Sequence, residues 1–179
     1  FTIRPDGSEL RQVTNLAQGL GDPAISPDGQ WLVFVSSIET EQRIQRIRVD
    51  GSSLSALYAS TEETGWPAWS PDGQRVVFAS RVGGHTSLFT VNADGSGLTQ
   101  ITSSPSSDVC PAYAPDGSRI VFSSNRSGAW ELYIYRVADG AISQLTSLAD
   151  PIGQGWPAWS PDGQKIAFEG QSGVDGSRE

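Results

Sequence analysis

The sequence predicts an all-β protein, a β-propeller built from four-stranded antiparallel blades. Two repeating markers predict this fold class. The first is a Pro-Asp-Gly turn, which recurs in steps of 44, 44 and 46 residues at Pro27, Pro71, Pro115 and Pro161. The second is an Asp-Gly pair, which recurs with nearly the same period at Asp6, Asp50, Asp94 and Asp139. A period of about 40–45 residues with strand-like segments is typical of propeller blades.

Each repeat contains four candidate strands. The first ends at the Pro-Asp-Gly turn, and its Trp69 and Trp159 are expected to pack between blades. The second is an apolar run with a central phenylalanine, as expected for a strand that is buried on both faces. The third alternates in polarity over 132–138, and the fourth is short and ends in Leu-Thr or a variant of it. Tight turns at Pro-Asp-Gly and Asp-Gly connect these strands.

Residues 1–169 hold four blades' worth of repeats. Complete blades are predicted over 22–59, 66–102 and 110–146, and half-blades over 1–14 and 156–169. The first half-blade supplies a third and a fourth strand, and the second supplies a first and a second strand. Together the two halves would make one composite blade, which removes exposed strand edges. The remaining residues, 170–179, are rich in Gly, Ser and charge and are predicted to form a flexible tail.

Three arrangements of the repeats are consistent with this count. Pairing of the two half-blades within one chain gives a closed ring of four blades. Two chains that share composite blades give a homodimer with a ring of eight blades. In the third arrangement the chain is a fragment of a larger propeller, since it begins in the middle of a repeat and has no initiator Met.

Composition and motifs exclude several classes of function. The net charge of −8 argues against a nucleic-acid partner, and no apolar run reaches the ~18 residues that a membrane span needs. Cys110 is the single cysteine, so no internal disulfide can form. The sequence contains no Gly-x-Ser-x-Gly elbow and no phosphate-binding loop, and His85 is its one histidine. The chain is therefore predicted to be non-catalytic.

The repeat resembles that of the TolB-like propeller family, a WD-repeat-like group. The resemblance lies in Trp-Ser-Pro-Asp-Gly, in the strand with a central Phe that follows it, and in Asp-Gly-Ser-Gly-Leu-Thr-Gln-Ile-Thr at 94–102. It spans residues 2 to about 168. The resemblance implies a bacterial protein, periplasmic or extracellular, that binds partner proteins. Similar repeats also occur in peptidases of the prolyl-oligopeptidase type and in some lyases.

Binding is predicted on the face that carries the variable loops, because the turns of the other face barely differ between copies. The residue that precedes Pro-Ala in each copy is expected to ring the mouth of the channel. These four residues are Asp22, Trp66, Cys110 and Trp156. Further candidates lie in the variable loops: Glu62, Glu63, Arg81, His85, Asp108, Arg126, Trp130 and Asp150.

The sequence thus predicts a non-catalytic scaffold that binds a protein or a peptide. Two alternatives stand beside it: the propeller portion of a larger hydrolase, peptidase or lyase, and the sensor ectodomain of a membrane-anchored protein. Acidic loop residues offer the oxygen ligands that Ca²⁺ prefers. Because no Asp-x-Asp-x-Asp-Gly loop is present, neither a metal nor another cofactor is predicted.

Overall fold

Three four-stranded antiparallel sheets, each with its strands in chain order, form the body of the computed structural model. The structure describes residues 1–16, 19–148 and 153–170. Blade 1 contains β1 (Gly19–Ile25), β2 (Trp31–Ile38), β3 (Glu41–Arg48) and β4 (Ser55–Ser60). Blade 2 contains β5 (Thr64–Trp69), β6 (Arg75–Val82), β7 (His85–Asn92) and β8 (Thr99–Gln100). Blade 3 contains β9 (Asp108–Tyr113), β10 (Arg119–Ser124), β11 (Glu131–Arg136) and β12 (Ile142–Gln144).

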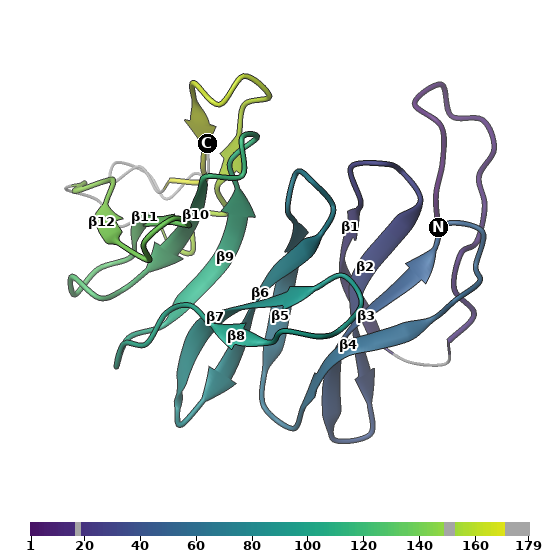
Figure 1. The fold of residues 1–179 in the computed structure, drawn as a ribbon, viewed down its shortest axis with the longest axis horizontal. Helices are drawn as coiled ribbons and strands as arrows, with labels where there is room; N and C mark the ends of the chain where they lie inside the picture. The colour runs from purple at the N-terminus through teal and green to yellow at the C-terminus, as the bar shows by residue number, and fades with distance from the viewer. Residues whose placement is uncertain (17–18, 149–152, 171–179) are drawn as a thin grey trace, which may run out of the picture.

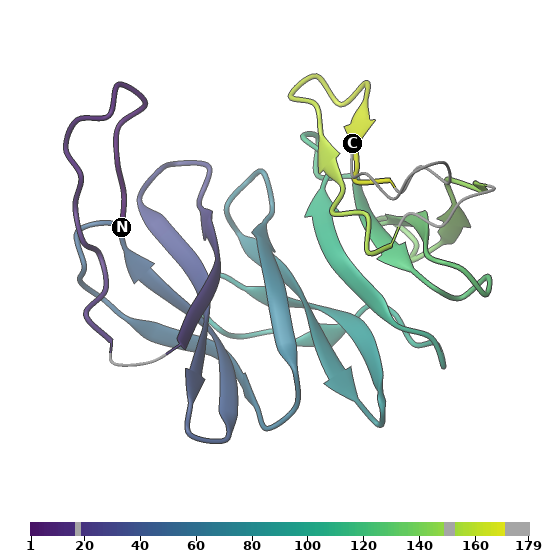
Figure 2. The same cartoon turned by 180° about the vertical axis from the view of Figure 1, so that it is seen from behind.

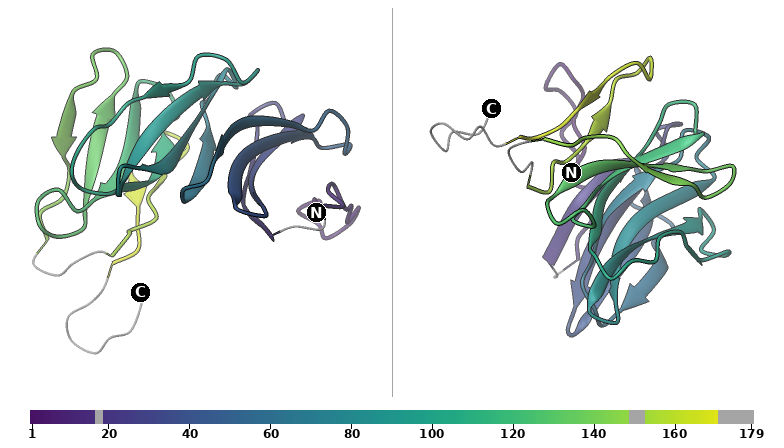
Figure 3. Two further views of the ribbon diagram at one scale, coloured as in Figure 1. Left: turned by 90° about the horizontal axis from the view of Figure 1, so that it is seen from below. Right: turned by 90° about the vertical axis from the view of Figure 1, so that its left-hand side faces the viewer.

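The blades follow one another along an open arc (Figures 1 and 2). At one end, residues 1–16 form a hairpin with an antiparallel bridge between Thr2 and Arg11. At the other end, β13 (Ala158–Trp159) pairs with β14 (Ile166–Ala167) in a two-stranded sheet. The view from below keeps the same order of blades (Figure 3). Among the described residues no backbone hydrogen bond joins the two end hairpins, so the composite blade and the closed ring stay predictions.

The hydrophobic core lies between neighbouring blades. β6 shows why, because its residues 76–80 are buried on both faces of the sheet. Phe78 packs toward blade 1, with its ring centroid 4.9 Å from that of Tyr58, whereas Ala79 packs toward blade 3 with Phe122. The apolar second strand of each repeat predicts this burial on both faces. Within the described residues no helix is long and apolar enough to cross a membrane.

The fourth strands of blades 2 and 3 end earlier than the sequence pattern indicates. β8 stops before Ile101-Thr102, and β12 stops before Leu145-Thr146. In each blade the threonine hydroxyl accepts a hydrogen bond from a backbone amide of the third strand, Leu88 in blade 2 and Leu132 in blade 3, at 2.9 Å. The ladder of backbone hydrogen bonds ends there because this amide donates to the threonine side chain. In a longer strand the same amide would donate to a backbone carbonyl of the fourth strand.

The aspartates of the turns share one pattern of hydrogen bonding. In the turn after β5, Asp72 Oδ1 accepts hydrogen bonds from the Ser70 hydroxyl at 2.5 Å and from the Gln74 amide at 3.0 Å. These two hydrogen bonds hold the pKa of Asp72 below its usual value of 3.8, and the bond from the Ser70 hydroxyl contributes more than the bond from the Gln74 amide. Hydrogen bonds to the ionised carboxylate lower the pKa in the same way at Asp6, Asp28, Asp50, Asp94, Asp116 and Asp162.

We expect the fold to lose stability as the pH falls below about 4. These turn carboxyls have a lower pKa in the folded protein than in the unfolded chain, so the unfolded chain takes up protons first. Their stabilisation is complete above the unfolded pKa and is lost as the pH falls through the folded pKa. Urea unfolding between pH 7 and pH 3, followed by tryptophan fluorescence, measures this loss. Asp72→Asn should be less stable at pH 7 and show a shallower loss in acid, whereas a pH-independent free energy of unfolding would contradict the prediction.

Candidate functional site

The structure brings the four residues that begin the blades together around one cavity. Asp22, Trp66, Cys110 and Trp156, each followed by a proline, line a volume of 210 Å³. The first three lie in the first strands of blades 1, 2 and 3, and Trp156 lies just before β13. We call these four residues the rim.

The rim has a shared backbone conformation that its sequence does not suggest. All four residues have a positive φ: 49° at Asp22, 54° at Trp66, 53° at Cys110 and 41° at Trp156. This left-handed region is uncommon for residues other than glycine. In blades 1, 2 and 3 it coincides with a shift of register between the first and second strands. Such bulges turn a side chain out of the regular ladder, so the backbone itself directs the rim side chains.

Two indole rings and a carboxylate form the accessible part of the rim. The rings of Trp66 and Trp156 are 6.2 Å apart at an interplanar angle of 69°, an edge-to-face contact. The side chain of Asp22 accepts a hydrogen bond from the Trp66 amide at 3.0 Å, which links blade 1 to blade 2. Trp156 is 53% exposed, so a large apolar surface faces solvent here.

Cys110 occupies the buried part of the rim. It is 6% exposed, and its burial, reinforced by the charge of Asp22, raises the pKa of the thiol to about 12. A hydrogen bond from the Trp156 amide acts in the opposite direction and is the smallest of the three causes. The thiol is therefore protonated at neutral pH, and a protonated, buried thiol is a poor nucleophile.

Two of the predicted loop residues bind each other inside blade 3. Arg126 Nη2 lies 2.8 Å from Asp108 Oδ1 and 2.9 Å from its Oδ2. The Asp108 side chain is fully buried, and the Arg126 guanidinium lies over the rings of Phe122 and Tyr133, at 5.3 and 5.0 Å from their centroids. This ion pair connects β9 to the loop after β10 and leaves neither charge free for a partner.

The other loop candidates differ in their exposure. Exposed side chains that a partner can reach belong to Glu62, Glu63, Arg81 and His85. Trp130 is half-buried and packs against the cluster of Val121 and Leu132. Asp150 lies outside the described residues.

One buried carboxylate was missed from the sequence. Glu131, at the start of β11, is 4% exposed and accepts hydrogen bonds from the Thr146 hydroxyl and, at 2.9 Å, from the Leu148 amide. It thus anchors the start of the loop after β12. The equivalent residue of blade 2 is Ser87. A charged residue at a position where another copy of the repeat has a small one is the sequence signal that could have identified Glu131. The described part of the chain brings no three His, Cys, Asp or Glu side chains together as metal ligands.

The family assignment follows from a match along nearly the whole chain. The model of the TolB β-propeller domain family matches residues 2–176. The chain therefore belongs to this family, as its repeats suggested. A comparison with curated proteins finds no match.

Solved structures with the same fold include TolB proteins and an enzyme. TolB from Acinetobacter baumannii is 21% identical with a TM-score of 0.82, over 97% of this chain and 43% of that one. An Agrobacterium tumefaciens protein described as TolB is 25% identical with a TM-score of 0.75, over 86% and 55% of the two chains. An oligogalacturonate lyase in complex with manganese is 16% identical with a TM-score of 0.72, over 93% and 54%. This chain spans about half the length of these proteins, and a shared fold does not choose between their functions.

Proposed function

We propose that the chain is a non-catalytic propeller scaffold, periplasmic or extracellular, that binds a protein or a peptide at the rim. One observation carries this proposal: the four left-handed rim residues surround a common cavity in which two indole rings meet edge to face. Tryptophan, with tyrosine and arginine, is enriched among the side chains that dominate binding energy at protein interfaces. Location outside the cytoplasm rests on the family alone.

The rim is suited to binding because it is already ordered. Trp66 is held by its contact with Trp156 and by the hydrogen bond between its amide and Asp22. A partner that covers these rings would remove apolar surface from water while ordering few new side chains. The carboxylate of Asp22, beside the rings, would favour a partner with a hydrogen-bond donor or a positive charge at that point.

The state of the reactive side chains favours binding over catalysis. The Cys110 thiol is buried and protonated, with a pKa of about 12. His85 is exposed at the start of β7, and among the described residues it has no hydrogen bond to a hydroxyl, thiol or carboxylate. A nucleophile needs such a neighbouring base to become active.

Replacing both rim tryptophans tests the proposal. We expect the Trp66→Ala/Trp156→Ala variant to recover at least about tenfold less of the bound partner from an envelope fraction, measured by quantitative mass spectrometry. Leu98→Ala/Leu145→Ala is the matched control, because it also removes two exposed apolar side chains but lies away from the rim. Circular dichroism must show that both variants are folded. Equal recovery by wild type and rim variant would refute binding at the rim.

A further inference from the structure

The cavity at the rim has walls that suit a positively charged group. It is lined by the four rim residues and by the proline that follows each of them, Pro23, Pro67, Pro111 and Pro157. Among the described residues, Asp22 is the only lining residue with a charge, since no Lys, Arg or His lies in the wall. Proline has no N–H, so the four prolines add no hydrogen-bond donor. The cavity therefore offers a negative charge and aromatic rings to a ligand.

The size of the cavity fits the end of one side chain. Its volume of 210 Å³ lies below the roughly 300 Å³ at which pockets for whole small molecules begin. Trp156 at its mouth is more than half exposed, so the chain that carries such a group can remain outside. The cavity thus suits the tip of a side chain that projects from a larger partner.

The two indole rings of the rim form the walls of a corner. Their centroids are 6.2 Å apart and their planes meet at 69°, so a group placed in the corner is close to both rings. The face of an indole is negative, and it attracts a cation within about 6 Å of the ring centroid more strongly than the rings of Tyr or Phe do. Trp66 is held in place because it packs against the core cluster of Ala79, Leu88, Phe122 and Tyr133. The corner is therefore a preformed site for a cation.

Asp22 supplies a carboxylate with one oxygen still available. Its Oδ2 accepts the hydrogen bond from the Trp66 amide at 3.0 Å. This close approach depends on Gly65, because a Cβ atom at that position would lie 3.2 Å from Oδ2. In the part of the chain that the structure describes, Asp22 has no ion pair and its Oδ1 has no hydrogen bond. Oδ1 is therefore available to a donor in the cavity.

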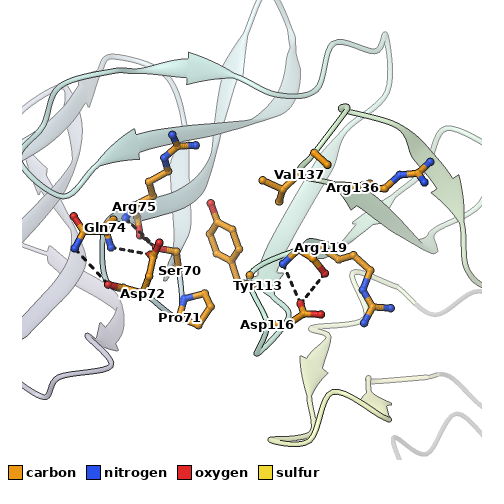
Figure 4. A pocket seen from close by; sticks show the side chains of 13 residues that line it. Ser70, Pro71, Asp72, Gln74, Arg75, Tyr113, Asp116, Arg119, Arg136 and Val137 are labelled. Carbon is orange, nitrogen blue, oxygen red and sulfur yellow. Dashed lines mark hydrogen bonds between the residues drawn. The ribbon is translucent and has the colours of Figure 1, made fainter.

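The aspartates of the Pro-Asp-Gly turns are engaged differently. Asp72 and Asp116 each accept two hydrogen bonds through Oδ1 from within their own turn (Figure 4). These bonds stabilise the turn, so the role of both carboxylates is local. The single hydrogen bond of Asp22 leads instead to the next blade, and it holds the carboxylate beside the cavity.

The arrangement around Asp22 favours the ammonium of lysine over the guanidinium of arginine. Arginine binds a carboxylate best through two parallel hydrogen bonds. The Trp66 amide already occupies Oδ2, so Asp22 offers a single strong bond through Oδ1. A compact ammonium makes such a bond while its methylene groups lie along the indole rings. An apolar side chain would instead cover the carboxylate without giving it a partner, which costs free energy.

We propose that the rim binds the ammonium end of a lysine side chain that projects from the partner, between the rings of Trp66 and Trp156 and against Oδ1 of Asp22. This inference rests on the proposed function, because it names the chemical group that the rim takes from its partner. The net charge of −8 adds attraction toward a basic segment at low ionic strength. A free quaternary ammonium compound such as choline carries the same charge, so the test includes it.

NMR titration of isotope-labelled protein tests the proposal, because each of the six tryptophans gives one indole N–H signal. The probes are Nα-acetyl-lysine methylamide and its norleucine counterpart, which lacks the ammonium group. We expect the lysine probe to shift the signals of Trp66 and Trp156 and to bind at least about fivefold more tightly than the norleucine probe. The matching arginine probe should bind more weakly than the lysine probe. Choline should also bind more weakly, because its trimethylammonium group has no N–H to donate to Asp22.

Asp22→Asn is the most specific variant, because asparagine keeps the size of the side chain and can accept the hydrogen bond from the Trp66 amide. It should weaken binding of the lysine probe by at least about fivefold and leave binding of the norleucine probe unchanged. Glu39→Gln is the matched control, because it removes one exposed carboxylate outside the rim and changes the net charge by the same amount. Trp156→Leu keeps an apolar side chain but removes a ring, so it should also weaken binding of the lysine probe. Circular dichroism must show that the variants are folded.

Equal affinity for the lysine and norleucine probes, an unchanged preference for lysine in Asp22→Asn, or tighter binding of the arginine probe or of choline would overturn the proposal. Partner recovery from the envelope fraction separates it from the proposed function. If Trp66→Ala/Trp156→Ala loses the partner and Asp22→Asn does not, the rim binds its partner without lysine, and only this inference fails. If the preference for lysine is present and Trp66→Ala/Trp156→Ala keeps the partner, only the proposed function fails.

Discussion

Replacing Arg126 by valine is expected to destabilise the protein by about 3 kcal/mol or more, because it leaves a buried charge without its partner. Asp108 has a fully buried side chain, and Arg126 neutralises it through contacts of 2.8 and 2.9 Å. Without the arginine, the carboxylate stays in the protein interior with no opposite charge beside it. Urea unfolding at neutral pH, followed by tryptophan fluorescence, measures the loss.

A double variant based on blade 2 tests whether the unpaired buried charge causes this loss, because blade 2 has uncharged residues at the two equivalent positions. The equivalents of Asp108 and Arg126 in blade 2 are Thr64 and Val82. There the Thr64 hydroxyl lies 2.9 Å from the hydroxyl of Ser80, whose equivalent in blade 3 is Ser124.

Asp108→Thr/Arg126→Val copies this arrangement into blade 3. It is expected to recover most of the stability that Arg126→Val loses, since a buried ion pair replaced as a whole costs little. A double variant as unstable as Arg126→Val would show that the buried charge is not the cause.

Phe78→Ala is expected to cost about 3–5 kcal/mol, the range for removing a large buried aromatic side chain. Phe78 is fully buried, and its ring centroid lies 4.9 Å from that of Tyr58 and 5.7 Å from that of Phe89. Truncation would open a cavity between blades 1 and 2 that the regular strands around it cannot close. Thermal and urea unfolding measure the effect.

Leu98→Ala is the control for this change, because Leu98 is 49% exposed in the hairpin between β7 and β8. It should change the free energy of unfolding by less than about 0.5 kcal/mol. Similar losses in the two variants would mean that the contact between blades 1 and 2 contributes little to stability.

The sequence predicted those parts of the fold that depend on local signals. The spacing of Pro27, Pro71 and Pro115 was sufficient to define three blades, because each turn is determined by the residues within it. The apolar run around Phe78 was sufficient to predict that β6 is buried on both faces, between two neighbouring blades. Closure of a four-bladed ring would depend instead on contacts between residues 1–14 and 156–169, which are far apart in sequence, and no local signal specifies such contacts.

The candidate site was predicted in part, for a related reason. Repeat symmetry placed Trp66 and its equivalents at one point in space, because equivalent residues of successive blades lie side by side. Symmetry does not reveal what differs between blades. The ion pair of Asp108 with Arg126 joins β9 to the loop after β10 within a single copy. It is visible only when the contacts between side chains are known.

The left-handed backbone of the rim has a consequence for how this protein can change over time. Four different starts to a blade, with Asp22, Trp66, Cys110 and Trp156, have the same φ to within a few tens of degrees. The main chain therefore sets the position of the side chain, and the side chain is free to vary in size and charge. A single nucleotide change in the gene could replace one rim residue while the blade around it stays intact. A substitution at the rim would therefore change the chemistry of this surface one residue at a time and leave the frame that carries it unchanged.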